Sequence, residues 1–411
     1  MATPESRNLI LLTVDSWRAD FAERHAGVDL LPSVAAMAPR RARFEHFYAN
    51  APWTTPALVT LMTGESPARH QVTYQWSAPR EGCPALARRL QEAGYAVPNL
   101  CHLNAIQGYQ NLGFDPREAP EAPASPEEDA LLRAILAHRN GSRPFFLWHH
   151  YRFLHLPYQA PEPCRRRMGI EEGVLPQHLL ESVCSHFVVP RGQFSFALED
   201  QDLIQRLYAA GVLQLDAFLK RLFEVLQEGD LVDRTTFVLT ADHGEELLDH
   251  GHVGHASTSH HATLHEEVLH VPLFIFDERI EGPMAITARM QGMDLHSTVL
   301  SLLGLKASGG PGTFDFSQAI LSSGGPLPPE RRDFYFQGAR KGFRTPREQE
   351  GQTVEGVSDG HRKVIFEAFD APRCMRYDLD ADPGEHHPRL FDPEAFQEER
   401  GWLDRVRGEV G

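Results

Sequence analysis

The residues best suited to chemistry follow an apolar segment in the middle of the chain. Residues 236–241 read as a buried β-strand, and Asp242 and His243 come directly after it. A strand that ends in a carboxylate and an imidazole presents two metal ligands side by side, because imidazole is the commonest protein ligand for metals. We therefore interpret Asp242 and His243 as a metal-binding pair rather than as part of a polar loop.

Histidine is concentrated in the segment after this pair. Seven of the chain's 22 histidines lie within 21 residues, namely His250, His252, His255, His260, His261, His265 and His270. A polar loop that is rich in histidine explains most of them. We expect one of the seven to contact substrate and the others to belong to the loop.

Two other segments offer residues at the end of a strand or the start of a helix. Asp15 follows the apolar run Leu9–Val14, and Thr54 lies at the mouth of an expected helix over 55–62, where unpaired backbone N–H groups favour an anion. Together with the first pair they form a mixed oxygen and nitrogen ligand set, which suits Zn or Mn and, less well, Ca or Mg. A metal held there would acidify the Thr54 hydroxyl and make it a nucleophile.

Strand-like and helix-like segments alternate along most of the chain. The expected strands are 9–14, 96–101, 144–149, 235–240 and 271–276, and the expected helices are 55–62, 83–93, 203–226 and 295–303. This alternation predicts an α/β fold, with a doubly wound, mostly parallel sheet flanked by helices. Ligands of such sheets gather at the carboxyl ends of the strands.

The composition changes in the C-terminal part. Residues 306–331 are rich in Gly, Pro and Ser, and 362–369 and 374–379 then have the pattern of two antiparallel strands before a charged helix. We therefore expect a catalytic domain over 1–310, a linker over 311–345 and a small C-terminal α+β subdomain with a short antiparallel sheet over 346–411.

The bulk composition narrows the classes of function. With 42% hydrophobic and 23% charged residues the chain is globular, and its formal net charge of −16 argues against a general nucleic-acid binder. A small anionic substrate remains compatible, because a local metal outweighs the global field. No apolar run approaches the ~20 residues of a membrane span. Five widely spaced cysteines indicate reduced thiols and a cytoplasmic protein, and nothing in the sequence sets the oligomeric state.

Several segments resemble the sulfatase branch of the alkaline phosphatase superfamily. They follow the order of that family over nearly the whole chain, and they are Asn8–Asp20, Trp53–Gly64, Pro67–His70, His155–Tyr158, Thr240–Glu246, His265–Leu273 and Tyr377–Glu385. The resemblance implies a doubly wound core domain with a small C-terminal subdomain. It also implies that the chain is a metal-dependent hydrolase of a small anionic ester.

The resemblance also assigns roles to individual residues. The family's metal ligands fall on Asp15, Asp242 and His243, and its nucleophile, which also contacts the metal, falls on Thr54. His155 matches the histidine that contacts the transferred group or protonates the leaving oxygen.

Two further positions of the family match less uniquely. A basic residue before the family's acidic pair matches His260 by ungapped spacing and His255 by its place after Gly254. Gln75 stands where the family often has an asparagine that binds a substrate oxygen.

Position 54 departs from the sulfatase pattern. True sulfatases carry there a Cys or Ser that is converted to formylglycine, with a supporting arginine close behind, whereas this chain has Thr54-Thr-Pro-Ala-Leu58. A threonine cannot become the aldehyde, so we favour hydrolysis of a phosphate ester, diester or monoester, through a covalent phosphothreonine. The Asp-x-x-x-His pair of two-metal relatives corresponds to Asp216 and Lys220. We therefore expect one metal, with Asp216 in a structural role.

Other readings of the same site stay open. They are a sulfate-ester or phosphonate-ester hydrolase, a soluble phosphotransferase that passes the group to an alcohol, and a non-catalytic member that binds an anion. His149 and His150 follow a predicted strand, and we interpret both as buried, hydrogen-bonded histidines. Trp53 either packs in the core or lines the pocket.

Overall fold

A seven-stranded sheet organises the larger part of the molecule, in the order β10-β4-β9-β6-β1-β5 with β11 beside β4. Its strands are β1 (Asn8–Val14), β4 (Arg41–Tyr48), β5 (Phe146–Tyr151), β6 (Thr235–Ala241), β9 (His270–Phe276), β10 (Met284–Ile286) and β11 (Met290–Gln291). The computed structural model describes residues 6–100, 107–109, 111–114, 127–171, 173–189, 193–256, 258, 261–391 and 397–411.

The strand directions confirm a mixed, mostly parallel sheet. β1 pairs in parallel with both β5 and β6, whereas β9 runs antiparallel to β6 and to β4. Every residue of β1, β5 and β6 is buried, as expected for strands covered on both faces. The strand β4 and the reversed direction of β9 were not predicted.

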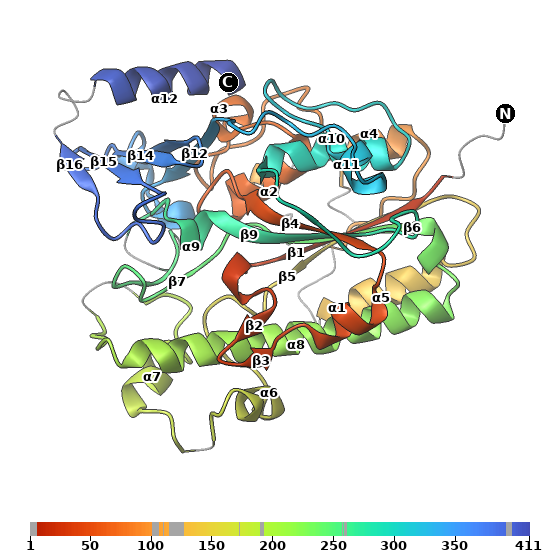
Figure 1. Ribbon diagram of the computed structural model, residues 1–411, viewed down its shortest axis with the longest axis horizontal. Helices are drawn as coiled ribbons and strands as arrows, with labels where there is room; N and C mark the ends of the chain where they lie inside the picture. Colours follow the sequence, from red (N-terminus) through yellow and green to blue (C-terminus); the bar gives the residue numbers. More distant parts are fainter. Residues whose placement is uncertain are drawn as a thin grey trace.

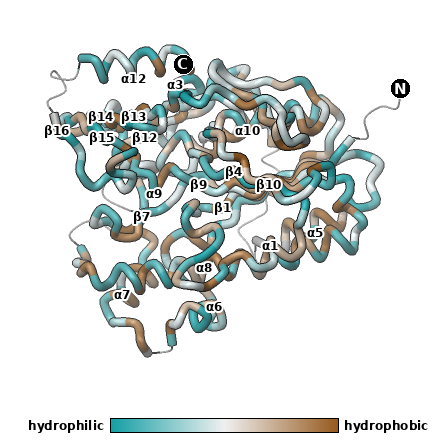
Figure 2. Tube along the Cα trace, viewed as in Figure 1, coloured by the Kyte–Doolittle hydropathy of each residue, from teal (hydrophilic) through white to brown (hydrophobic). Residues whose placement is uncertain are grey.

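Helices cover both faces of this sheet (Figure 1). One layer contains α1 (Pro32–Met37), α5 (Glu127–His138) and α8 (Asp200–Glu228), and the other contains α2 (Thr54–Thr63), α4 (Leu86–Glu92), α10 (Gly292–Leu302) and α11 (Ser317–Leu321). Along α8 hydrophobic and hydrophilic residues alternate, as expected of a helix with one buried face (Figure 2). Asp216 of α8 accepts hydrogen bonds from the backbone N–H and the hydroxyl of Ser33 at 2.9 and 2.7 Å, which gives it a structural role at α1.

Short elements connect these layers. The helices are α3 (Pro67–His70), α6 (Glu162–Arg167), α7 (Gln177–Glu181) and α9 (Glu266–Leu269), and the strands are β2 (Arg24–His25), β3 (Val28–Asp29), β7 (Glu246–Leu247) and β8 (Val253–Gly254). Of the strand expected over 96–101, residues 96–100 form only a bridge between Ala96 and Phe145, since Pro98 has no N–H to donate, and residue 101 lies outside the described residues. Across the described ranges, no helix combines the length and the apolarity needed to cross a bilayer.

The C-terminal part is a five-stranded antiparallel sheet with a helix on one face. Its elements are β12 (Phe334–Ala339), β13 (Thr353–Ser358), β14 (Arg362–Glu367), β15 (Arg373–Asp378), β16 (Arg389–Phe391) and α12 (Gln397–Val410). The predicted antiparallel sheet is confirmed. The segment 311–345, predicted as a linker, contains α11 and β12, and β12 is the first strand of this sheet.

The C-terminal sheet packs directly against the segment before α2. Trp53, which is 1% exposed, belongs to an apolar cluster with Phe336, Ile365 and Leu264, so it packs in the core rather than lining a pocket. At Gly338 of β12 an added Cβ would come within 2.6 Å of Pro52, so only glycine allows this approach. The larger sheet and the C-terminal sheet therefore meet next to Thr54.

Candidate active site

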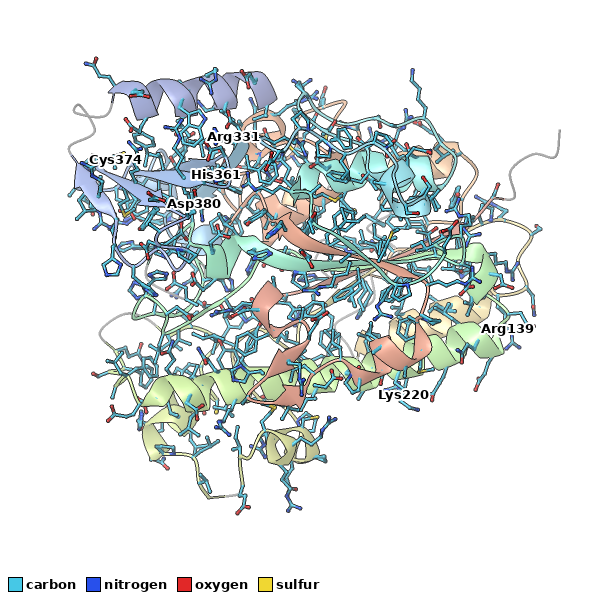
Figure 3. All side chains as sticks on the ribbon, viewed as in Figure 1. Arg139, Lys220, Arg331, His361, Cys374 and Asp380 are labelled. Atoms are coloured by element: carbon cyan, nitrogen blue, oxygen red, sulfur yellow. The ribbon has the colours of Figure 1, made fainter. Side chains whose placement is uncertain are left out.

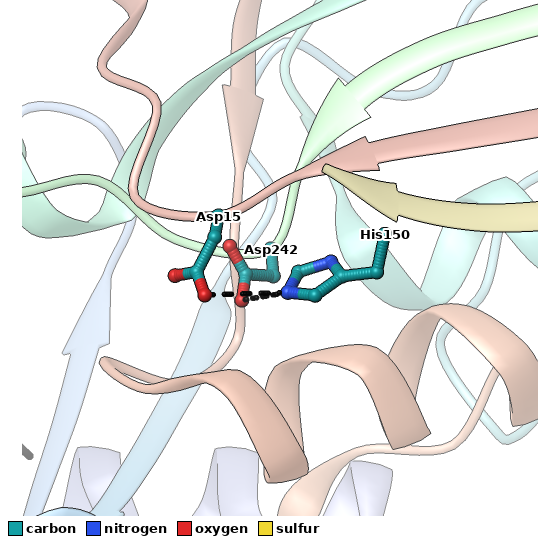
Figure 4. A group of neighbouring side chains, drawn as sticks. All are labelled: Asp15, His150 and Asp242. Atoms are coloured by element: carbon teal, nitrogen blue, oxygen red, sulfur yellow. Dashed lines mark hydrogen bonds and ion pairs between the residues drawn. The ribbon is translucent and has the colours of Figure 1, made fainter. Parts of the chain in front are cut away.

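Three neighbouring strands bring two carboxylates and an imidazole together at one edge of the sheet. The end of β1 is in register with that of β6, so that Asp15 and Asp242, the next residues of each, emerge side by side. On the other side of β1, His150 of β5 is paired with Thr13. Nε2 of His150 lies 3.4 Å from Oδ2 of Asp15 and 3.9 Å from Oδ2 of Asp242 (Figure 4). These three buried side chains could hold a metal ion.

His243 adds a second imidazole to this group. Its Nδ1 lies 2.8 Å from the carbonyl oxygen of Gly244, which can only accept, so Nδ1 carries the proton and Nε2 of the neutral ring is a lone pair. That Nε2 lies 3.3 Å from Oδ2 of Asp242 and 3.7 Å from Oδ1 of Asp15. The lone pair of His243 Nε2 and these carboxylate oxygens repel one another unless a proton or a cation lies between them. The site is therefore suited to a cation.

Thr54 is the first residue of α2 and lies beside this imidazole. Its hydroxyl is 3.3 Å from Nε2 of His243 and donates to it in the absence of a metal. Because Trp53 before it has an extended backbone, the first N–H groups of the ten-residue α2 have no helical acceptor. An anion near the Thr54 hydroxyl would therefore find free N–H donors and the positive end of the helix dipole.

Ser16 arranges the two carboxylates. It adopts a left-handed backbone with φ of 63°, a conformation that non-glycine residues seldom adopt. Its N–H donates to Oδ1 of Asp242 at 3.2 Å, and its hydroxyl donates to Oδ1 of Asp15 at 3.0 Å. Oδ2 of Asp242 is left buried without a hydrogen-bond partner among the described residues. The serine thus leaves one oxygen of Asp242 available for a ligand.

The two carboxylates have opposite pKa shifts. Burial raises the pKa of Asp242 above its usual range, and the charge of Asp15 raises it further. Burial also opposes ionisation of Asp15, but the nearby His155, His150 and His243 outweigh it and hold the pKa of that carboxyl well below its usual range. Two buried carboxylates of this kind share their negative charge most favourably with a cation.

His255 and Glu245 form a second buried pair next to the first group. Nδ1 of His255 is 2.8 Å from Oε1 of Glu245, and the His255 ring centroid is 4.2 Å from that of His243. Burial raises the pKa of Glu245 well above the usual range of a glutamate, and burial lowers the pKa of His255 well below the usual range of a histidine. The pair is therefore neutral, and Nε2 of His255 has no hydrogen-bond partner among the described residues. In the tautomer in which the Glu245 carboxyl donates to Nδ1, this Nε2 carries a proton.

His155 lies next to His255. The two ring centroids are 5.0 Å apart, and the His155 ring stacks on the half-exposed ring of Phe187 at 4.4 Å. Nδ1 of His155 donates to the carbonyl oxygen of Leu156 at 2.6 Å, so Nε2 is the unprotonated atom of the neutral ring. Burial lowers the pKa of His155, although Asp15 opposes this shift. At neutral pH the residue therefore offers a proton acceptor.

Most of the residues predicted from the sequence meet at this site. Those brought together are Asp15, Thr54, His155, Asp242, His243 and His255. Gln75 is exposed in a turn after α3, and its role stays a prediction. His260 lies outside the described residues, so the structure provides a position for His255 alone.

His150 and Glu245 were missed as site residues. His150 is buried and hydrogen-bonded through Nδ1 to the Thr13 hydroxyl at 2.9 Å, as predicted, but its other nitrogen faces the two carboxylates. Alternation along β5 separates His149 from His150, yet only the pairing with β1 tells which of them faces Asp15. Glu245 could have been predicted as a site residue, because it lies two residues after His243 in the sequence.

Known proteins resemble this chain along most of its length. The family model described as sulfatase matches residues 7–305. Choline-sulfatase from Rhizobium meliloti (strain 1021) is 28% identical over 111 residues, which cover 27% of this chain and 22% of that protein. Arylsulfatase K from Xenopus laevis is 25% identical over 191 residues, which cover 41% of this chain and 34% of that protein. The chain thus matches well under half of the length of these curated relatives.

Solved structures share the whole architecture. The phosphonate monoester hydrolase of Agrobacterium radiobacter superposes with a TM-score of 0.76 at 19% identity, over 98% of this chain and 95% of that one. The phosphonate monoester hydrolase from Silicibacter pomeroyi gives a TM-score of 0.71 at 17% identity, over 98% and 94% of the two chains. At these identities the likeness establishes the fold.

Proposed function

The chain belongs to the sulfatase family, and on this premise we propose that it hydrolyses a phosphate ester with Thr54 as the nucleophile. The observation that carries the proposal is the Thr54 hydroxyl at the start of α2, 3.3 Å from the lone pair of His243 and beside two buried carboxylates. A threonine cannot supply the formylglycine of true sulfatases. Direct attack by its hydroxyl on phosphorus is the chemistry that remains for this residue.

Asp15, His150, Asp242 and His243 would hold one divalent metal ion. Two carboxylates and two imidazoles favour Zn or Mn over Ca and Mg, which prefer oxygen ligands alone. When bound, such an ion acidifies a hydroxyl and neutralises charge on a phosphoryl group.

The remaining steps follow from the protein's own groups. Thr54 Oγ1, whose hydroxyl proton would pass to solvent before the substrate binds, attacks phosphorus, and the backbone N–H groups of Thr54 and Thr55 at the start of α2 stabilise charge on the phosphoryl oxygens. The bond to the leaving alcohol breaks, and the alcohol takes the proton that Nε2 of His255 carries. As that proton leaves, Nδ1 of His255 takes the proton of Glu245, so the ring stays neutral. Water then attacks the phosphothreonine and gives its proton to a bare imidazole nitrogen of His155 or His255, which releases phosphate and Thr54.

A phosphonate monoester is the second candidate substrate. The fold likeness to two phosphonate monoester hydrolases favours it, and the same residues would attack a phosphonate in the same way. Sulfate esters, transfer to an alcohol instead of water, and binding without turnover are the other outcomes to be distinguished.

A panel of p-nitrophenyl esters tests the proposal. We expect the parent, loaded with Zn²⁺ or Mn²⁺, to cleave phosphodiester, phosphate or phosphonate esters faster than the sulfate ester. Thr54→Ala should lower turnover at least about 10³-fold, and Thr54→Ser, which keeps a hydroxyl, should retain part of it. Equal turnover by the parent and Thr54→Ala would overturn the assignment of the nucleophile. Added alcohols that become phosphorylated would identify a transferase.

A further inference from the structure

The loop that connects β12 with β13, residues 340–352, lies close to Thr54. It begins two residues after Gly338, where an added Cβ would come within 2.6 Å of Pro52. Pro52 in turn is two residues from Thr54 in the chain. A loop anchored this close to the nucleophile borders the space in which a substrate is bound.

The last part of this loop contacts the segment after α3. The backbone N–H of Gly351 donates to the Tyr74 hydroxyl at 2.7 Å. The Arg347 guanidinium lies over the Trp76 ring, 5.6 Å from its centroid. The rings of Tyr74 and Trp76 are stacked at 4.8 Å, and Gln75 stands between them in the sequence. These contacts hold the loop beside the segment for which the family resemblance predicts a substrate contact.

The first part of the loop contacts the opposite side of the site. The ring of Phe343 lies 6.4 Å from that of Phe187, edge-on at 61°. Phe187 is 50% exposed, and its ring stacks on that of His155 at 4.4 Å. The backbone N–H of Val189 donates to the carbonyl oxygen of Thr258 at 3.0 Å, which holds this segment against the chain after β8. The two phenylalanines therefore form an apolar surface next to His155.

This surface lies on the side of the site from which a leaving group departs. In the proposed reaction Thr54 attacks phosphorus in line, so the leaving oxygen is opposite Thr54 and takes its proton from His255. The rings of His255 and His155 are 5.0 Å apart, and Phe187 covers a face of the His155 ring. The carbon skeleton behind the leaving oxygen therefore extends towards Phe187 and Phe343.

We propose that Phe187 and Phe343 bind the leaving group of the ester, and that this group is an alcohol or phenol with an apolar carbon skeleton. The inference rests on the proposed esterase function. Neither phenylalanine donates or accepts a hydrogen bond, so a sugar would lose water from its hydroxyls there without gaining a partner. An apolar skeleton gains from the same burial, and an aromatic ring gains further from packing against the phenylalanines.

Two esters with matched leaving groups test this proposal on the full chain loaded with Zn²⁺. They are the esters of cyclohexylmethanol and of glucose at its 6-hydroxyl, which both release a primary alcohol beside a ring of the same size. The acid is the phosphate or phosphonate that the p-nitrophenyl panel selects. We expect the parent to have at least about 10-fold higher kcat/KM for the cyclohexylmethyl ester, since hydroxyls that lose water without a new partner weaken binding by that order.

Replacement of Phe343 tests the contact itself. Phe343→Ala should raise KM for the cyclohexylmethyl ester about 10-fold, with a smaller effect on kcat, because it removes binding that the ground state and the transition state share. The KM for the glucose ester should change much less. Phe343→Leu keeps an apolar side chain and should retain most of the preference. Phe187→Ala also uncovers His155, so it should lower kcat as well.

His361→Ala is the matched control in the C-terminal sheet. His361 is exposed at the end of this sheet opposite to the loop, where its Nδ1 lies 3.1 Å from Asp380 (Figure 3). This variant should leave both KM values unchanged. Equal kcat/KM for the two esters in the parent would overturn the proposal, and so would an equal loss for both esters in Phe343→Ala.

Binding of phosphonates that stay intact separates this inference from the esterase proposal. In 2-phenylethylphosphonate a carbon replaces the leaving oxygen. By calorimetry the parent should bind it at least about 10-fold more tightly than methylphosphonate, and Phe343→Ala should lose most of this difference. A parent that shows the preference but cleaves no ester would contradict the esterase proposal alone. A parent that cleaves esters without the preference would contradict the leaving-group inference alone.

Discussion

Nδ1 of His255 lies 2.8 Å from Oε1 of Glu245, and both side chains are fully buried. The carboxyl group sets both the orientation and the tautomer of the ring. Nε2 then points away from Glu245 with a proton that no described residue accepts. A substrate oxygen is the natural acceptor for that proton.

Removal of the Glu245 carboxyl should therefore impair catalysis more than binding. For Glu245→Ala we expect kcat to fall about 10- to 100-fold while KM changes little, because positioned proton transfer contributes on that order or more. Glu245→Gln keeps a donor to Nδ1 and should lose less activity than the alanine variant. Steady-state kinetics with one p-nitrophenyl ester checks this, and equal kcat in the parent and Glu245→Ala would contradict it.

His150 should contribute to metal affinity. Its Nε2 lies 3.4 Å from Asp15, and His150→Ala removes one of two imidazoles, so we expect Zn²⁺ to bind the candidate active site at least about 10-fold more weakly. His149→Asn is the matched control, because the neighbouring ring packs near Phe218 of α8 instead. Titration with a competing chelator measures both. An affinity that falls equally in the two variants would point to disturbed packing of β5 rather than to a lost ligand.

Acid should destabilise the fold through His70 and His296, two buried histidines that lie beside α2. Burial lowers the pKa of His70 to about 3 and that of His296 to about 4. An unfolded histidine has a pKa of about 6.5, so protons bind the unfolded chain first as the pH falls. The stability that the neutral rings provide is therefore fully present above about pH 6.5, and each ring loses up to about 1.4 kcal/mol per pH unit below it.

A single variant isolates one of these contributions. His296 donates through Nδ1 to the carbonyl oxygen of Met62 at 3.0 Å, and His296→Asn keeps a donor at that position. Between about pH 6 and pH 5 the free energy of unfolding should fall less steeply in this variant, by about 1.4 kcal/mol per pH unit. Urea unfolding at several pH values measures the slope, with the exposed His361→Asn as control. Identical slopes in parent and His296→Asn would refute the prediction.

Lys363 should be essential for the C-terminal sheet. The side chain is fully buried in β14 and contacts Glu266 at 2.6 Å and Glu385 at 2.9 Å. Lys363→Met leaves the buried Glu385 and the partly exposed Glu266 without their cation, which costs about 3–5 kcal/mol of the free energy of unfolding. The triple variant with Glu266→Gln and Glu385→Gln should recover a large part of that loss. Urea unfolding compares the three proteins, and a single variant as stable as the parent would contradict this role.

The sequence predicted much of the site because its residues terminate regular elements. Asp15 and Asp242 follow apolar runs that had to be central parallel strands, and the carboxyl ends of such strands meet. Thr54 could be placed at a helix start from Pro56 alone. The role of His150 could not be predicted, since it depends on which face of β5 pairs with β1 towards Asp15. That information lies in the register between strands more than 130 residues apart.

The same limit applies to the histidines after Asp242 and to β9. His250 and His265 are 15 residues apart in the chain, and only the tertiary fold stacks their rings. The apolar run of β9 fits a parallel or an antiparallel strand equally well, because both of its faces are covered. Long-range packing, rather than local preference, decided each of these cases.

The contact between Pro52 and Gly338 has a consequence for protein engineering. The segment that delivers Thr54 to the site is shaped on one side by β12, so the position of Thr54 depends on the C-terminal sheet. A chimaera that takes its C-terminal sheet from a relative would therefore need residues 51–53 from that same relative. Without them, the graft would fold around a displaced Thr54, and turnover would be lost although both halves were intact.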